Sequence, residues 1–314
     1  MTAATENIKY KKRKMRVDKL WPYIFVLPFI LLYALFNLYP IIYSFFISLT
    51  NWDGISEKTF IGFKNYFSIF TSDPYFFKSI WNTVLIMLQS TPFVIIFGLI
   101  LAAFMFNLSV GRQAFQTITF LPYITTPVAI GFIFAFLFDW QTGIINNILI
   151  HTGLLKEGVN WLGDARYARL VVAIMIIWKY TGYHMVVYLS GLSSISPELY
   201  EAAKVDGSSQ LNTFFRITVP LLQPITVFLV ITDIIGGLQM FDEPSLMFSG
   251  WIGGGAAGGP ERSCLTAIWN FYDVTFKSTS RFGYGAAIAY SLFMIIIIFS
   301  FAGFKLTNRR EKSC

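Results

Sequence analysis

The segment Glu201-Ala202-Ala203-Lys204-Val205-Asp206-Gly207, which leads into Ile217-Thr218-Val219-Pro220, decides how this chain is organised. It is a charged segment, interrupted by glycine, between two strongly apolar runs. The chain of 314 residues is 55% hydrophobic and only 13% charged, whereas a soluble domain carries about 25% charged residues. The sequence therefore predicts an all-α integral membrane protein in which this segment connects two membrane-spanning helices.

Six segments are long and apolar enough to cross a bilayer, which requires about 20 mostly apolar residues. They are Pro22–Leu49, Ile80–Phe106, Ala114–Phe138, Leu170–Leu192, Ile217–Gln239 and Gly283–Phe304. We expect them to form one transmembrane domain over residues 21–306, with a connecting loop at residues 193–216 between the fourth and fifth spans. The pairs Gly98/Ala102 and Gly131/Ala135 have the small-residue spacing that allows close contact between membrane helices.

Lysine and arginine indicate the orientation. A dense basic run, Lys9–Lys19, stands directly before the first span, and together with the short flanks on the same side of the predicted membrane it holds more basic residues than the longer loops on the other side. Basic flanks face the cytoplasm. We therefore predict that residues 1–20 and residues 307–314 are cytoplasmic tails and that the loop at residues 193–216 is also cytoplasmic. The net charge of +7 then reflects orientation and does not indicate nucleic-acid binding.

The loop has its own helical signals. Ser196 suits an N-cap, Pro197 suits the first helical position, and Glu198 complements the helix dipole in the first turn. Gly207 permits a sharp stop, and a second short helix is expected over residues 210–215. A short protruding helix can lie in a groove of another protein; read without its wider pattern, it is equally an amphipathic link between two spans.

The wider pattern is more specific. Glu201-Ala202-Ala203, Asp206-Gly207, a phenylalanine at 214 or 215, Ile217 and Pro220 resemble the signature loop of bacterial ABC importer permeases, and in particular of the maltose-type sugar-importer branch. The resemblance extends over nearly the whole chain, including Phe60–Tyr66, Trp161-Leu162, Gly258-Gly259-Pro260 and Phe282–Ala287. The chain departs from the pattern at Ser208, where alanine is usual, and at Val219, where leucine is usual.

The resemblance implies a permease subunit that imports a di- or oligosaccharide across the bacterial cell membrane. It implies a second permease subunit in a heterodimer, two cytoplasmic ATPase subunits, and an extracellular or periplasmic sugar-binding protein. It also implies that the ATPase docks on Glu198, Leu199, Tyr200, Glu201, Ala202, Ala203, Asp206, Gly207 and Phe214. The sequence contains no P-loop, so we expect a transport subunit that is not an enzyme and holds no cofactor, with ATP and Mg bound by the partner ATPase.

A sugar path through the membrane needs hydrogen-bonding side chains and aromatic faces. The candidates are Asn82, Gln89, Tyr123, Tyr180, Tyr183, Tyr188, Gln239 and Phe241. Each of these taken singly is as readily explained by helix–helix contact or by the interfacial aromatic belt. We expect a few members of the set to line the path.

Two charges fall inside predicted spans, where charges are costly and usually face an interior. Lys179 and Asp233 lie at similar distances from the loop, which predicts a structural ion pair, and His184 is expected to be a packed polar residue. An ion-coupled secondary transporter that uses Lys179 and Asp233 is the alternative function. A membrane enzyme is a further alternative, but Asp242-Glu243 is the only adjacent acidic pair that supports it. No metal site is expected.

Overall fold

The computed structural model describes residues 21–108, 110–249, 257–277 and 280–311. The predicted basic tail at residues 1–20, residues 312–314 and most of the glycine-rich stretch after Ser249 lie outside the described residues. The described chain is almost entirely helical, with one two-stranded antiparallel hairpin in which β1 (Thr50–Asn51) pairs with β2 (Thr59–Phe60). By length and composition, four helices can cross a membrane, or six if each of two bent helix pairs counts as one span.

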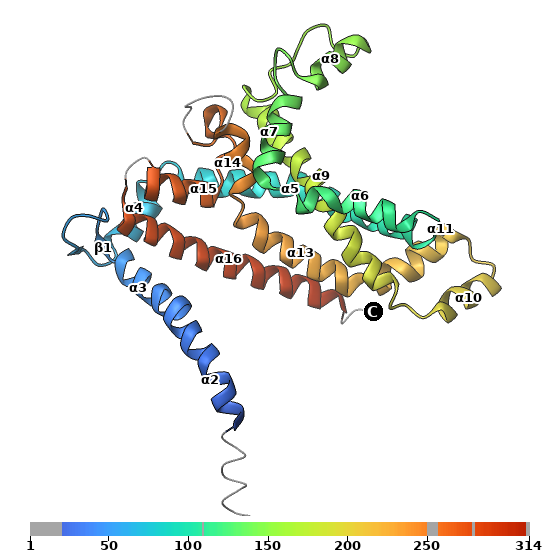
Figure 1. Ribbon diagram of the computed structural model, residues 1–314, viewed down its shortest axis with the longest axis horizontal. Coiled ribbons are helices and arrows are strands. Elements are labelled where there is room, and N and C mark those ends of the chain that lie inside the picture. Colours follow the sequence, from blue (N-terminus) through green and yellow to red (C-terminus); the bar gives the residue numbers. More distant parts are fainter. Residues whose placement is uncertain (1–20, 109, 250–256, 278–279, 312–314) are drawn as a thin grey trace, which may run out of the picture.

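The first apolar segment is helical over most of its predicted length. It consists of α2 (Trp21–Tyr33), a π-helical segment (Ala34–Leu38) and α3 (Tyr39–Ser48). Apolar side chains along α2 are exposed on every side, and the helix points away from the other helices (Figure 1). The contact with the bundle is made by α3 against α16, where the hydroxyl of Tyr290 donates to the carbonyl oxygen of Ile41.

Three long helices form the frame of the bundle: α5 (Phe76–Phe106), α9 (Ala165–Leu192) and α16 (Phe282–Glu311). They contain the predicted second, fourth and sixth spans. α5 packs along α9, and a Cβ atom added at Gly98 would lie 2.6 Å from the Cβ of His184. The small-residue prediction is thus confirmed at this contact, because only glycine permits this approach of the two helices.

The third predicted span is wrong as a single helix. The segment forms α6 (Arg112–Ile124) and α7 (Pro127–Leu137), whose axes are bent by 93° at the break. Thr126 has an extended backbone (ψ 137°), the conformation that a following proline favours, and Pro127 then begins the next helix. α7 therefore leaves the bundle and packs against α14 (Asp242–Ser249), with Gly131 close to the backbone of Leu246.

The fifth predicted span is also bent. Residues 210–221 form α11 (Gln210–Thr213), a π-helical segment (Phe214–Thr218) and α12 (Val219–Leu221), so the second loop helix is longer than predicted. The chain then turns by 61° into α13 (Gln223–Leu238). The buried Leu222 stands at the bend, and Pro224 is the second residue of the new helix.

The bundle has two distinct ends (Figure 1). α10 (Pro197–Val205) and α11 lie at the loop end, and the hairpin, α4 (Lys64–Thr71) and α15 (Ala267–Tyr272) lie at the opposite end. α8 (Ile144–His151) follows α7 away from the bundle. The remaining short segments are a 3-10 turn (Pro260–Arg262) and a π-helical segment (Asp273–Lys277).

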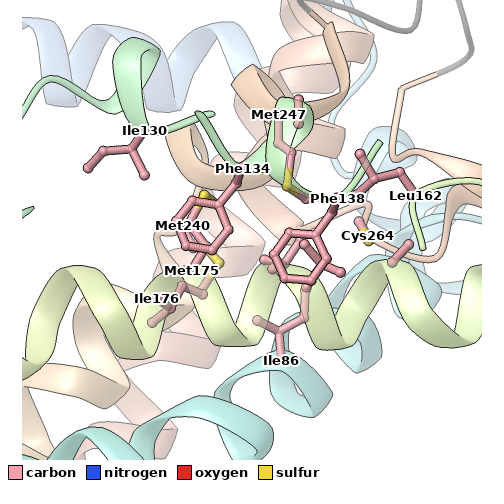
Figure 2. Packing of buried hydrophobic residues seen from close by; sticks show 14 residues of the cluster. Ile86, Ile130, Phe134, Phe138, Leu162, Met175, Ile176, Met240, Met247 and Cys264 are labelled. Atoms are coloured by element: carbon pink, nitrogen blue, oxygen red, sulfur yellow. The ribbon is translucent and has the colours of Figure 1, made fainter. Parts of the chain in front are cut away.

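A buried apolar cluster joins α5, α7, α9 and the α14 region. Figure 2 shows Phe134 of α7 and Phe138, which directly follows α7, facing α9 with its Met175 and Ile176, and Ile86 of α5 beneath them. Since apolar side chains elsewhere are exposed to the lipid, such internal contacts decide how the helices pack. Ile176 and Met240 of this cluster also line a cavity that lies beside it.

Candidate functional site

A cavity of about 190 Å³ lies between α5, α6, α9, α13 and α14. Tyr123 of α6 stacks on Tyr183 of α9, with ring centroids 4.9 Å apart and planes inclined by 21°. Tyr180 approaches Tyr123 edge-on, with centroids 5.8 Å apart. The aromatic wall exists because α6 and α9 touch backbone to backbone: a Cβ atom at Gly182 would lie 2.0 Å from the carbonyl oxygen of Thr119.

The acidic side chains of the cavity are held by partners on α9. Lys179 donates from Nζ to Oε1 of Glu243 across 2.7 Å, and the Tyr180 hydroxyl donates to the same oxygen across 2.8 Å. The side chains of Lys179 and Glu243 are each 8% exposed. This buried pair ties α14 to α9, and removal of either partner would leave an uncompensated charge.

His184 joins α9 to α13. Its Nε2 lies 3.1 Å from Oδ2 of Asp233, and its Nδ1 lies 3.1 Å from the carbonyl oxygen of Tyr180. A carbonyl oxygen only accepts hydrogen bonds, so Nδ1 carries a proton. The His184 side chain is 1% exposed and the Asp233 side chain 17% exposed, so this contact ties α9 to α13 at the wall of the cavity.

The predicted ion pair between Lys179 and Asp233 is wrong, although both charges are paired. The prediction measured depth along a straight fifth span, whereas the bend at Leu222 means that Asp233 lies only ten residues beyond the start of α13 at Gln223. At 1.5 Å per residue Asp233 is roughly 15 Å along that helix, which brings it level with His184 instead of Lys179. Glu243, which sequence reasoning set aside, is the partner of Lys179.

The proposed path residues divide into two groups. Tyr123, Tyr180 and Tyr183 line the cavity, together with His184 and Asp233. The other candidates lie elsewhere. Asn82 donates to the carbonyl oxygens of Arg262 and Leu265, and the buried Tyr188 donates to Thr226. Gln89 is exposed on α5, Gln239 lines a separate groove beside α15 and α16, and Phe241 packs on Tyr272. For Asn82 and Tyr188, structural contact with the chain itself is therefore the correct interpretation.

The loop helix α10 ends as its sequence predicts. Gly207 has φ +74°, the amide of Gly207 donates to Lys204 O, and the amide of Ser208 donates to Ala203 O. These two bonds form a Schellman cap, which needs a residue in the left-handed region at this position. Ser196 is the N-cap by position, and Ser209 caps α11 by accepting from the Asn212 amide. The loop is therefore a defined structure of two short helices.

The outer surface of the loop carries exposed apolar side chains and acidic side chains that form no ion pair within the described residues. Val205 is 87% exposed and Leu211 73% exposed, whereas Leu199 is 44% exposed. Within the described chain neither Glu201 nor Asp206 forms an ion pair. Val205 is a surface residue that sequence reasoning did not single out.

The inner side of the loop faces the chain itself. Ala203 is buried, so only Ala202 of the predicted alanine pair is available to a partner. The hydroxyls of Tyr200 and Thr218 lie 3.2 Å apart and join α10 to the segment that leads into α13. A groove of about 770 Å³ separates the loop from the ends of α5 and α9, and Glu201 and Phe214 lie on its rim.

The sequence and the fold match known membrane transport proteins. The model of the family described as "Binding-protein-dependent transport system inner membrane component" matches residues 67–310. The lactose transport system permease protein LacF of Rhizobium radiobacter is 35% identical over 290 residues, which cover 92% of this chain and 94% of that protein. The arabinooligosaccharides transport system permease protein AraP of Bacillus subtilis (strain 168) is 31% identical over 91% of this chain and 88% of that protein.

A solved structure shares the fold. A chain in the crystal structure of a bacterial ABC transporter involved in the import of the acidic polysaccharide alginate superposes with a TM-score of 0.80, at 23% identity, over 95% of this chain and 99% of that chain. Fold and sequence together define a multi-pass membrane transport component. The chain belongs to the family of binding-protein-dependent transport system inner membrane components. The predicted importer permease is confirmed at this level, and the chain is a component of a transporter.

Proposed function

We propose that this chain is the permease subunit of an ATP-driven importer that receives a di- or oligosaccharide from a binding protein outside the cell. The observation that carries the proposal is the cavity between α6, α9 and α13, which combines stacked tyrosines with carboxyl oxygens that can accept further hydrogen bonds. Sugar sites need these two features, an aromatic face and convergent polar groups. The names of LacF and AraP, which refer to lactose and arabinooligosaccharides, support a carbohydrate substrate.

The partners follow from a translocation path that one chain does not enclose. We propose a second, different permease subunit beside this one and two cytoplasmic ATPase subunits, which bind ATP and Mg. In this arrangement the loop end of the bundle and both termini are cytoplasmic, and the opposite end meets the binding protein at the surface of the bacterial cell membrane.

Coupling to the ATPase would run through α10 and its cap. Leu199, Val205 and Leu211 supply apolar contacts on the outer surface, and Glu201 and Asp206 supply charges that a partner can pair. The contact between Tyr200 and Thr218 makes the loop move as one body. ATP-driven motion of the docked subunit would then reach α9 and α13, the two helices that the loop connects and that also line the cavity.

The test is the ATPase activity of the purified assembly in lipid, with and without sugar-loaded binding protein. We expect loaded binding protein to stimulate the wild-type assembly, and we expect Glu201→Lys and Val205→Asp to abolish stimulation or release the ATPase. Glu157→Lys makes the same charge change at an exposed site between α8 and α9 and should leave stimulation intact. An assembly in which both loop variants behave like Glu157→Lys would contradict the role of the loop.

An ion-coupled secondary transporter is not favoured. Lys179 and Asp233 do not pair with each other but with the buried side chains of Glu243 and His184, and the family is one of binding-protein-dependent transport components. Uptake into vesicles that contain ATP but have a collapsed ion gradient separates the two functions. The ion-coupled alternative predicts that this uptake stops, and our proposal predicts that it continues.

A further inference from the structure

The ionisable groups around the cavity compensate one another internally. No lysine or arginine is among the described residues that line it. Lys179, which stands behind the wall, is bound to Glu243 and lies 5.0 Å from the centroid of the Tyr180 ring. The other ionisable pair joins His184 to Asp233, with Nε2 3.1 Å from Oδ2. The cavity thus offers an incoming anion no unpaired cation.

We propose that the cavity admits uncharged sugars and rejects anionic ones, and that Asp233 and Glu243 are its specificity-determining residues. This inference rests on the proposed function, because it concerns the chemical class of the carbohydrate in the same cavity. The cavity would admit sugars whose polar groups are all hydroxyl groups, and it would reject uronates, sulfonates and phosphorylated sugars.

The hydrogen-bond acceptors of the cavity support this distinction between neutral and anionic sugars. Among the described residues, none donates a hydrogen bond to Oδ1 of Asp233 or to Oε2 of Glu243, whose other oxygens are engaged. Both free oxygens belong to residues that line the cavity. Each can accept a hydrogen bond that a sugar hydroxyl group donates. A neutral sugar carries many hydroxyl donors, whereas a ligand carboxylate is itself an acceptor and would face acceptors.

Desolvation acts in the same direction. A carboxylate that leaves water needs a paired cation and several donors to offset the cost. The nearby hydroxyls of Ser90 and Thr232 already donate to carbonyl oxygens of their own helices, those of Ile86 and Phe228. The stack of Tyr123 on Tyr183 offers a sugar ring an apolar face but offers an anion no charge.

The test measures direct sugar binding to the purified assembly in nanodiscs, without binding protein, by saturation-transfer difference NMR. Lactose, maltose, galactobiose and arabinotriose serve as neutral probes. The probe that binds tightest is compared with its uronate, in which a terminal hydroxymethyl group is oxidised to a carboxylate. The variants are Asp233→Asn and Glu243→Gln, and Glu157→Gln is the control, since it removes the same charge from an exposed site.

We expect the wild type to bind the neutral sugar at least about tenfold more tightly than its uronate, because a carboxylate in this desolvated site finds no unpaired cation to offset its lost hydration. The ratio should fall at least about threefold in Asp233→Asn and further in Glu243→Gln, where Lys179 loses its counter-ion, and it should not change in Glu157→Gln.

Equal affinity of the wild type for the neutral sugar and its uronate overturns the inference, as does an unchanged ratio in both cavity variants. If loaded binding protein still stimulates ATPase activity in that case, the importer function stands and only the charge selectivity falls. If none of the neutral probes binds, the carbohydrate assignment falls together with the inference.

Discussion

Replacing Gly182 by alanine should separate α6 from α9 and disturb the aromatic wall of the cavity. The added Cβ would lie 2.0 Å from the carbonyl oxygen of Thr119, 2.7 Å from its carbonyl carbon and 3.0 Å from the Cα of Phe120. Contacts under 3.0 Å are essentially never adopted by Cβ atoms, so the backbones must part by roughly 1 Å. Overpacking of this kind costs about 1–3 kcal/mol, and we expect the upper part of that range because the obstacle is backbone.

The cost can be measured by unfolding the assembly in lipid and following how fast the buried Cys264 reacts with a fluorescent maleimide. A Cys314→Ser background leaves Cys264 as the cysteine that is labelled in the gel band of this chain. Gly236→Ala is the matched control, since Gly236 lines the same cavity but has no atom within 4 Å of an added Cβ. The control should be unchanged or more stable by up to about 1 kcal/mol. Identical unfolding midpoints for Gly182→Ala and wild type would refute the close backbone contact, and with it the position of Tyr123.

Three further outcomes follow from the same contacts. Lys179→Met should destabilise the assembly by about 3–5 kcal/mol, and adding Glu243→Leu should recover at least half of the loss in the maleimide assay, whereas adding Asp233→Leu should not. Gly207→Ala places a side chain at φ +74°, which costs about 1–2 kcal/mol, so ATPase stimulation should fall while sugar binding by NMR stays unchanged. Burial raises the pKa of the Cys264 thiol to about 12, so native protein at pH 8 should react with maleimide far more slowly than urea-unfolded chain; equal rates would contradict its burial.

The straight spans were predictable because length and hydropathy suffice for them. α5, α9 and α16 contain the predicted segments, and the loop helix ends at Gly207 as its glycine indicates. The bends were not predicted, because a hydropathy profile averages over Pro127 and Pro224 and treats them as tolerated interruptions. In the structure each proline lies in the first turn of a new helix with a new direction.

The errors in the candidate site have the same origin. Depth along a straight helix matched Lys179 to Asp233, but the 61° bend shifts Asp233 toward His184. Three of the tyrosines proposed for the sugar path line the cavity, yet the sequence does not distinguish Tyr183, which faces the cavity, from Tyr188, which donates to Thr226. Only the direction in which each side chain leaves its helix decides this, and that direction depends on tertiary packing.

The two walls of the cavity are connected to the loop in different ways. α9 is continuous from the cavity to Leu192, so the face at residues 180–184 lies about 12–18 Å from the loop at 1.5 Å per residue and moves rigidly with it. α13 reaches the loop only through the bend at Leu222, close to which Gly191 of α9 packs tightly on Ile225. Because this contact is tight, a displaced loop should rotate α13 about it and change the distance between α9 and α13 farther along the helices. The bond from His184 to Asp233 spans that distance, so it should be the first cavity contact to lengthen when the loop is driven.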